Sequence, residues 1–385
     1  MPNHSSNNIF SLSNQDTARL KGIAIIAMLA HHVLQYPPAG FEYGSLLTAI
    51  GVIGKVCVAI FLFCSGYGLY AQFSKLMDDS YIIHCACPHT HTHTHTHTCA
   101  RIIKNTIAFL LNRFAKFYAG YWPIFLIFVP ITILCFDRSL ADAYGENVNV
   151  IKRLLYDFIG IQGWNSYNST WWFNKLILIF YLLFPVVYVV IRKCTWIGII
   201  LSCALCMLSN ALLKYDSFEL LLWQFPFVMG MFWKQTEGKM VRLSKIITQY
   251  KYFSGFLIIL LLAFIVSQRL YGIIPYLPAG MRWDTFVVCC IVMITILFVR
   301  ETKYLSATLS FLGKHSMNIY LLHTFVHCYW GKISAWVYSP YIGARYGVNV
   351  LVLLGVCLIL SLLIETMKKH LGWNMLVNLL LLSKK

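Results

Sequence analysis

The chain has 385 residues, of which 59% are hydrophobic and 12% are charged. Soluble domains carry about 25% charged residues, and the mean hydropathy of +0.67 is also high, so this composition excludes an ordinary soluble domain and indicates a polytopic membrane protein. The net charge of +17 is therefore read first as an orientation signal in membrane loops, and we expect no nucleic-acid partner.

Apolar segments of roughly 20 residues, the length that crosses a bilayer, recur along the whole chain. They predict an all-α bundle of about ten transmembrane helices over residues 19–368, between a polar tail at 1–18 and a short tail at 369–385. The amphipathic segment 150–161 is too short to span, and we expect it either to lie in the membrane interface or to re-enter the membrane. The predicted spans are 20–36, 49–70, 117–136, 172–191, 195–213, 217–233, 252–268, 285–299, 315–331 and 349–367.

Lysine and arginine predict the orientation of these spans. With the N-terminus in the cytoplasm, the inner segments carry 21 of the 31 basic residues and the outer loops carry 8. Cytoplasmic loops are enriched in lysine and arginine. We therefore expect both termini on the cytoplasmic side, with the cell membrane as the location.

The first span reads RLKGIAIIAMLAHH and contains ionisable groups, which are functional candidates inside a bilayer. Lys21 and His32 are eleven residues apart, so they share a helix face at roughly 20° and lie about 16 Å apart along the axis. Arg19 falls on the far side from His32. The alternative is structural: Lys21 extends to the interface and His32 bonds a neighbouring helix.

Residues 87–100 read CPHTHTHTHTHTCA, five histidines at every second position between two cysteines. On an extended strand these imidazoles would point the same way and could bind zinc, nickel or copper. Alternating histidine and threonine can also be encoded by a repeated CA dinucleotide, because CAC codes for histidine and ACA for threonine. Such DNA repeats expand by slippage during replication. We interpret 84–99 as an inserted low-complexity segment on the cytoplasmic side and expect it to be dispensable.

Five stretches occur in a fixed order along the chain. In this order and spacing, from about residue 17 to 367, the chain resembles the acyltransferase-3 family of integral membrane acyltransferases. The resemblance implies about ten spans and transfer of an acyl group, often acetyl, from acyl-CoA to a hydroxyl of an extracytoplasmic or membrane-linked glycan. The stretches are LKGIAIIAMLAHH, VAIFLFCSGYGLY, LLNRFAKF, STWWFNKLILIFYLLFPVVY and GKHSMNIYLLHTFV.

The resemblance also implies a site. The family signature on the first helix is a basic residue, ten intervening residues and a histidine, here Lys21 and His32, and His32 is expected to be a general base or to carry the acyl group itself. Lys21 is expected to bind the donor together with Arg113 and Lys116, which occupy the family's Arg-x-x-Arg position. Without the resemblance, Arg113 and Lys116 would be ordinary positive-inside residues. The residues expected to line the pocket are Ser65, Tyr67, Trp172 and His323.

We expect no bound cofactor and no metal centre, because acyl-CoA, with acetyl-CoA as the expected donor, would be a co-substrate. The alternative is a multi-span metal-ion transporter with a cytosolic histidine-rich loop. Metal transport needs acids and histidines within the spans, whereas only Glu219 and Glu365 of the 14 acids fall inside predicted spans. A flippase or a lipid-binding scaffold is a third possibility, and a flippase would not need His32.

Overall fold

The computed structural model describes residues 8–38, 43–85, 94–209, 218–338 and 345–373, together with Met375 and Val377. Most of these residues are helical, and none of them lies in a β-strand, which confirms the predicted all-α class. Seven helical segments of the described chain are long and apolar enough to cross a membrane, so the protein is an integral membrane protein. They are Asn14–Gln35, Ser45–Asp78, Ala100–Cys135, Ser169–Lys193, Lys251–Tyr271, Met281–Glu301 and Gly347–His370.

Three of the ten predicted spans are helical without meeting that length and apolarity. The fifth corresponds to α8 (Thr195–Met207), the sixth to α10 (Phe218–Thr236), and the ninth to α15 (Ser316–Thr324), which continues as the π-helical segment η7 (Phe325–Tyr329). Thirteen or nine residues of α-helix rise only about 20 or 14 Å, less than the roughly 30 Å of a bilayer core. Within the described residues, seven of the ten predicted spans meet the length and apolarity of a membrane-crossing helix.

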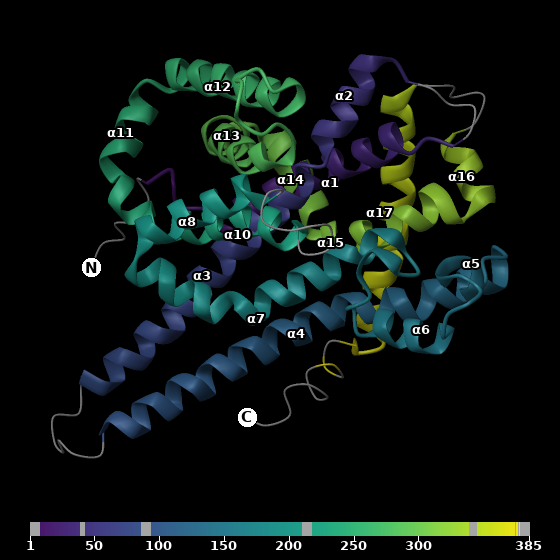
Figure 1. Ribbon diagram of the computed structural model, residues 1–385, viewed down its shortest axis with the longest axis horizontal. Coiled ribbons are helices and arrows are strands. Elements are labelled where there is room, and N and C mark those ends of the chain that lie inside the picture. The colour runs from purple at the N-terminus through teal and green to yellow at the C-terminus, as the bar shows by residue number, and fades with distance from the viewer. Residues whose placement is uncertain are drawn as a thin grey trace.

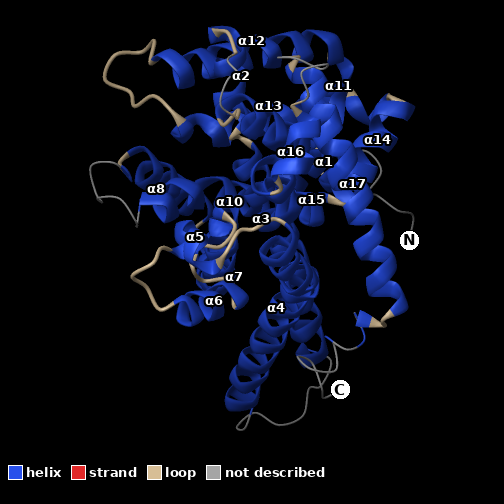
Figure 2. Ribbon diagram, turned by 90° about the vertical axis from the view of Figure 1, so that its right-hand side faces the viewer, coloured by secondary structure: helices blue, strands red, loops and turns tan. Residues whose placement is uncertain are grey.

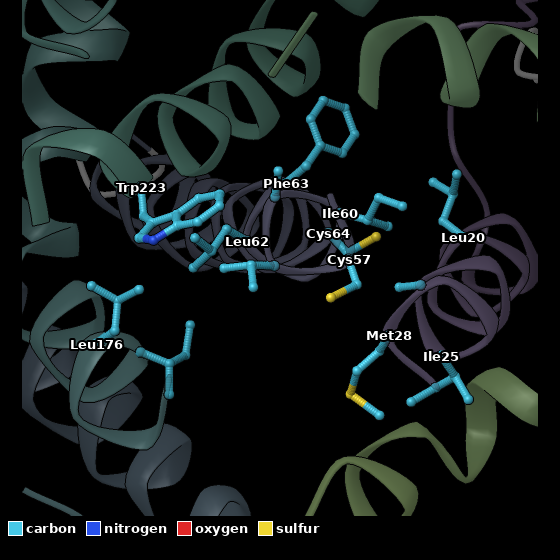
Figure 3. Close-up of a cluster of buried hydrophobic side chains, with 14 of the residues drawn as sticks. Leu20, Ile25, Met28, Cys57, Ile60, Leu62, Phe63, Cys64, Leu176 and Trp223 are labelled. Atoms are coloured by element: carbon cyan, nitrogen blue, oxygen red, sulfur yellow. The ribbon is translucent and has the colours of Figure 1, made fainter. Parts of the chain in front are cut away.

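Helix α1 (Asn14–Gln35) lies at the centre and is held by close backbone contacts. A Cβ atom on Gly22 would overlap the carbonyl oxygen of Leu309 on α14 (Lys303–Lys314), and one on Gly313 would overlap that of Ala18. Small residues allow membrane helices to approach this closely. Figure 3 shows the buried apolar cluster between α1, α3 and their neighbours, with Trp223 from α10 and Leu176 from α7 (Trp172–Lys193).

Helices α3 (Cys57–Cys85) and α4 (Thr94–Cys135) form a long hairpin that leaves the bundle at one corner (Figure 1). With 42 residues, α4 is about 63 Å long, roughly twice the thickness of a bilayer core. The hairpin therefore extends beyond the membrane. Half of the predicted low-complexity insert, residues 86–93, lies outside the described residues; residues 84–85 end α3, and residues 94–99 begin α4 as helix.

The segment between α4 and α7 covers one end of the bundle. It contains the short helices α5 (Leu140–Tyr144) and α6 (Val150–Phe158) and the 3-10 turns η1 (Gly163–Asn165) and η2 (Ser169–Trp171). Helix α6 exposes Ile151 and Leu155 but buries Asp157. Lys152 is exposed as well. Exposed apolar side chains beside a lysine suit a helix lying at the membrane surface, which stays the prediction for 150–161.

The remaining helices complete the bundle around α1 (Figure 2). α2 packs against the end of α1, α12 pairs with α13, and α17 contacts α1, α15 and α4. Their bounds are α2 Ser45–Gly54, α11 Val241–Gln249, α12 Lys251–Tyr271, α13 Asp284–Leu297, α16 Gly331–Val337 and α17 Tyr346–His370.

Candidate active site

A cavity of about 350 Å³ lies where the C-terminal end of α1 meets α3, α7 and α15. Its walls also include Lys55, which lies in the break between α2 and α3, and side chains from η1 and η2. Three of the predicted site residues, His32, His323 and Trp172, line this cavity, and the rings of His32 and His323 are neighbours. His32 lies in the last turn of α1, nearer the end of the helix than its predicted mid-membrane position.

Four imidazoles gather at this end of the bundle. The ring centroid of His32 lies 4.6 Å from that of His323, 5.1 Å from that of His31 and 6.4 Å from that of His327. Within the described part of the chain, no three histidine, cysteine or acidic side chains are arranged to hold a metal ion. Neighbouring imidazoles of this kind can exchange and orient hydrogen bonds.

Hydrogen bonds assign different roles to these rings. His31 Nδ1 lies 2.7 Å from the carbonyl oxygen of Gly51, and His323 Nδ1 lies 2.7 Å from that of Tyr320. A carbonyl only accepts, so Nδ1 carries the hydrogen in both rings and Nε2 of each is left as an acceptor. The ring nitrogens of His32 have no hydrogen-bond partner among the described residues, so His32 is available to a substrate in the cavity.

A hydroxyl network forms the wall beside His323. The hydroxyl of Thr324 lies 3.3 Å from His323 Nε2 and 3.0 Å from the hydroxyl of Thr170. Tyr320 donates its hydroxyl to the Thr170 carbonyl at 2.9 Å, and Asn168 accepts from the Thr170 hydroxyl at 2.7 Å. These residues were not predicted from the sequence. Tyr320 comes three residues before His323 and four before Thr324, and this helical spacing could have shown that the three share one helix face.

Lys55 and a pair of indoles form the opposite wall. Trp164 and Trp172 stack with ring centroids 4.6 Å apart and planes 11° apart, and Lys55 Nζ lies 5.8 and 6.0 Å from the two ring centroids. Gly163, just before Trp164, has a φ of +78°, a conformation that favours glycine and that turns the chain into η1. Lys55 was not among the predicted site residues.

A sequence profile describes a family of acyltransferase domains, acyltransferase-3, and it matches residues 19–366, nearly the whole chain. The chain belongs to the acyltransferase-3 family. It is therefore a membrane acyltransferase, with an acyl donor, an acyl acceptor and the lipid bilayer as partners. No curated protein and no solved structure matches the chain.

The donor-binding residues expected for an acyltransferase-3 protein lie in three separate places. Lys21 is half-buried on α1, about 16 Å along the helix from His32. Arg113 donates to the Gln72 side chain and stacks on Phe109 at 4.8 Å from the ring centroid. Lys116 lines a separate hollow. The described residues therefore do not bring the three cations into one pocket.

The hollow at Lys116 has a volume of about 400 Å³ and is also lined by Lys314 and Lys368. One carboxylate, Glu365, is present and accepts from Lys368 at 2.6 Å. Three lysines around one acid leave an excess of positive charge, a composition that suits a phosphate group. Lys314 and Lys368 were not predicted, because they come from α14 and α17, far from Lys116 in the sequence.

Ser65 and Tyr67 do not line the cavity. The Ser65 hydroxyl donates to the carbonyl of Phe61 on its own helix at 2.8 Å. The Tyr67 hydroxyl donates to Glu237 at 2.7 Å and accepts from the backbone of Leu12 at 2.9 Å. Both side chains therefore bond within the bundle, and their part in a pocket stays a prediction. Gly66, between them, serves packing, because a Cβ there would overlap the Phe227 carbonyl of α10.

Proposed function

We propose that this membrane acyltransferase moves an acyl group, with acetyl as the expected group, from cytosolic acyl-CoA to a hydroxyl of an extracytoplasmic or membrane-linked glycan. The observation that carries the proposal is the position of His32. Its ring faces the cavity without a hydrogen-bond partner among the described residues and lies 4.6 Å from the oriented ring of His323.

In this reaction His32 acts as a general base. It takes the proton of the acceptor hydroxyl while that oxygen attacks the thioester carbonyl; the new C–O bond forms, the C–S bond breaks, and coenzyme A leaves as the thiol after accepting a proton. A positioned general base contributes about 10²–10⁴-fold in rate. The alternative is an acyl-histidine intermediate on the same residue, and both routes require His32.

The arrangement of α15 supports a donor that enters from the cytoplasm. Met317 and Asn318 line the three-lysine hollow, and Tyr320 and His323 line the cavity. From Asn318 to His323 the helix rises only about 7.5 Å, so one short helix borders both spaces. The phosphates of acyl-CoA would bind at the lysines, with the thioester directed toward His32. Lys21 and Arg113 remain proposed donor contacts on the same side.

The excess of basic residues in the inner segments supports cytoplasmic termini and a cavity that opens toward the outer face of the cell membrane. Acceptor and donor would then reach His32 from opposite sides. The histidine-rich segment takes no part in this scheme.

The test follows radiolabelled acetyl-CoA into glycan or lipid-linked material in membranes that contain the protein. We expect transfer by the wild type and by a variant lacking residues 84–99, and a loss of at least about 10²-fold for His32→Ala. Transfer that depends on the deleted segment and survives His32→Ala would contradict the proposal.

A further inference from the structure

We propose that the cavity selects an acceptor sugar that carries a negative charge, and that Lys55 and the stacked indoles of Trp164 and Trp172 make this selection. The inference rests on the proposed function, because it names the class of acceptor that the same cavity takes.

The indole pair offers a flat surface of the kind that binds a sugar ring. Both indoles line the cavity, they are parallel to within 11°, and Trp164 is 50% exposed. One face of a pyranose ring presents mainly C–H groups, which pack against the electron-rich face of an aromatic ring. Trp164 comes from η1 and Trp172 from the start of α7, so the polar loop before α7 and the helix itself each supply one ring.

Lys55 gives this surface its charge. Its ammonium lies at the edge of the indole pair, in a break between two apolar helices. A charged group in a membrane span is costly and is usually paired. Arg269, in the same bundle, is completely buried and paired with Asp284, whereas Lys55 has no ion-pair partner among the described residues.

Two carboxylates act on Lys55 at longer range. Glu219 and Asp284 interact with it electrostatically, but Asp284 is already bound by Arg269, and neither acid lines the cavity. The cavity walls are otherwise mostly aromatic rings, imidazoles and hydroxyls. A neutral sugar on the indoles would leave the ammonium without a counter-charge in a poorly solvated space, where charge pairs are stronger than in water.

An anionic group on or next to the sugar ring would complete the site. A carboxylate of a uronic acid and a phosphate attached to a saccharide share this chemistry. Either would pair with Lys55 while the ring stacks on the indoles and a hydroxyl reaches His32.

The test compares acetyl transfer to three acceptors, methyl glucoside, methyl glucuronide and glucose 1-phosphate, by the wild type and by Lys55→Gln. We expect the wild type to prefer at least one charged acceptor, and we expect the kcat/KM ratio of charged to neutral acceptor to fall at least about tenfold in Lys55→Gln. The two charged acceptors distinguish a carboxylate site from a phosphate site.

Lys175→Gln is the matched control. Lys175 is an exposed lysine on α7 whose side chain lies beside Gly163 but does not line the cavity. We expect its acceptor ratio to equal that of the wild type. Lys55→Arg, which keeps the charge, should retain most of the preference.

Binding is measured separately by saturation-transfer difference NMR with the same three saccharides and no donor. We expect the wild type to bind a charged saccharide more tightly than methyl glucoside, and Trp164→Ala to weaken binding of both. Equal binding of charged and neutral saccharides by the wild type would overturn the inference even if acyl transfer occurs. Selective binding without any acyl transfer would instead overturn the proposed function and leave the anion site standing.

An equal loss with all acceptors in Lys55→Gln would also overturn the inference. In that case Lys55 would stabilise charge in the reaction itself and would not select the acceptor.

Discussion

The imidazoles around the cavity differ in what their ring nitrogens bind. His31 and His323 each bond a backbone carbonyl through Nδ1, and His327 Nδ1 lies 2.8 Å from the Tyr338 hydroxyl. All three bonds orient the rings, and the two carbonyl contacts also fix the tautomers of His31 and His323. Among the four, His32 alone has no hydrogen-bond partner on its ring within the described chain, which is why we propose it as the base and propose a positioning role for its neighbours. Helical spacing alone selects Lys21 and His32, but only the fold places His323 beside His32.

Tyr320→Phe tests the wall that holds His323. The Tyr320 hydroxyl donates to the Thr170 carbonyl at 2.9 Å, and its loss leaves a buried acceptor without its donor, at a cost of about 1–3 kcal/mol. We expect a lower melting temperature and a higher KM for the acceptor, both measured on detergent-purified protein. Tyr304→Phe, on a tyrosine that is 84% exposed, should change neither value. A Tyr320→Phe protein as stable as the wild type would show that the network does not hold the wall.

Among the helices, the packing of α3 on α10 depends on glycine at defined positions. Gly66 of α3 and Gly230 of α10 each face the backbone of the other helix. The stretch FCSGYG was predicted to line a pocket through Ser65 and Tyr67, yet the structure assigns its glycine to a helix contact. Small residues at close crossings and small residues at binding sites look alike in a sequence, because both are selected for the absence of a side chain.

Gly66→Ala should therefore destabilise the bundle. The added Cβ would overlap the Phe227 carbonyl oxygen, and relieving an overlap with backbone costs at least about 1–3 kcal/mol. Gly68→Ala is the control on the same helix, because nothing lies within 4 Å of a Cβ at that position. We expect the melting temperature to fall for Gly66→Ala only. A similar effect of both substitutions would mean that helix propensity, and not the crossing, decides the result.

The loop elements between α4 and α7 should respond to pH through Asp157 on α6. Asp157 accepts hydrogen bonds from the Tyr144 hydroxyl and the Tyr167 backbone, both at 2.5 Å, and burial raises its pKa to about 6. The folded state therefore binds the proton more tightly than the unfolded chain. This contribution is fully present below pH 4 and is lost as the pH rises through 6, by up to about 3 kcal/mol.

We expect the difference in melting temperature between pH 5 and pH 7.5 to be smaller in Asp157→Asn, since asparagine keeps an acceptor but does not titrate. The wild type should gain more stability than this variant on acidification. An unchanged difference would assign the pH dependence to other groups.

For the whole molecule, composition and charge were enough to predict a polytopic all-α membrane protein, because lipid requires backbone polar groups to be satisfied within helices. The ninth predicted span shows where hydropathy fails to predict the course of a helix. Its hydropathy is continuous, but the chain passes from α15 into a π-helical segment and then α16, and tertiary packing decides such breaks. Lys55 was passed over for a similar reason, since a lone lysine in an apolar segment cannot be distinguished from one that extends to the interface.

The predicted orientation can be tested with two exposed cysteines, Cys135 at the end of α4 and Cys194 between α7 and α8. The charge distribution places Cys135 outside and Cys194 inside. In intact cells expressing single-cysteine variants, we expect a membrane-impermeant maleimide to label Cys135, and to label Cys194 only after the membrane is opened. The reverse pattern would invert the topology and with it the proposed entry sides of donor and acceptor.

The central claim is that His32 is the group on which acyl transfer depends. The most direct measurement is the rate of acceptor-dependent coenzyme A release by purified protein in proteoliposomes, for the wild type, His32→Ala and His370→Ala, the last an exposed histidine at the end of α17. We expect His32→Ala to lower kcat by at least about 10²-fold while the protein inserts normally, and we expect His370→Ala to match the wild type. Wild-type turnover by a correctly inserted His32→Ala protein would contradict it.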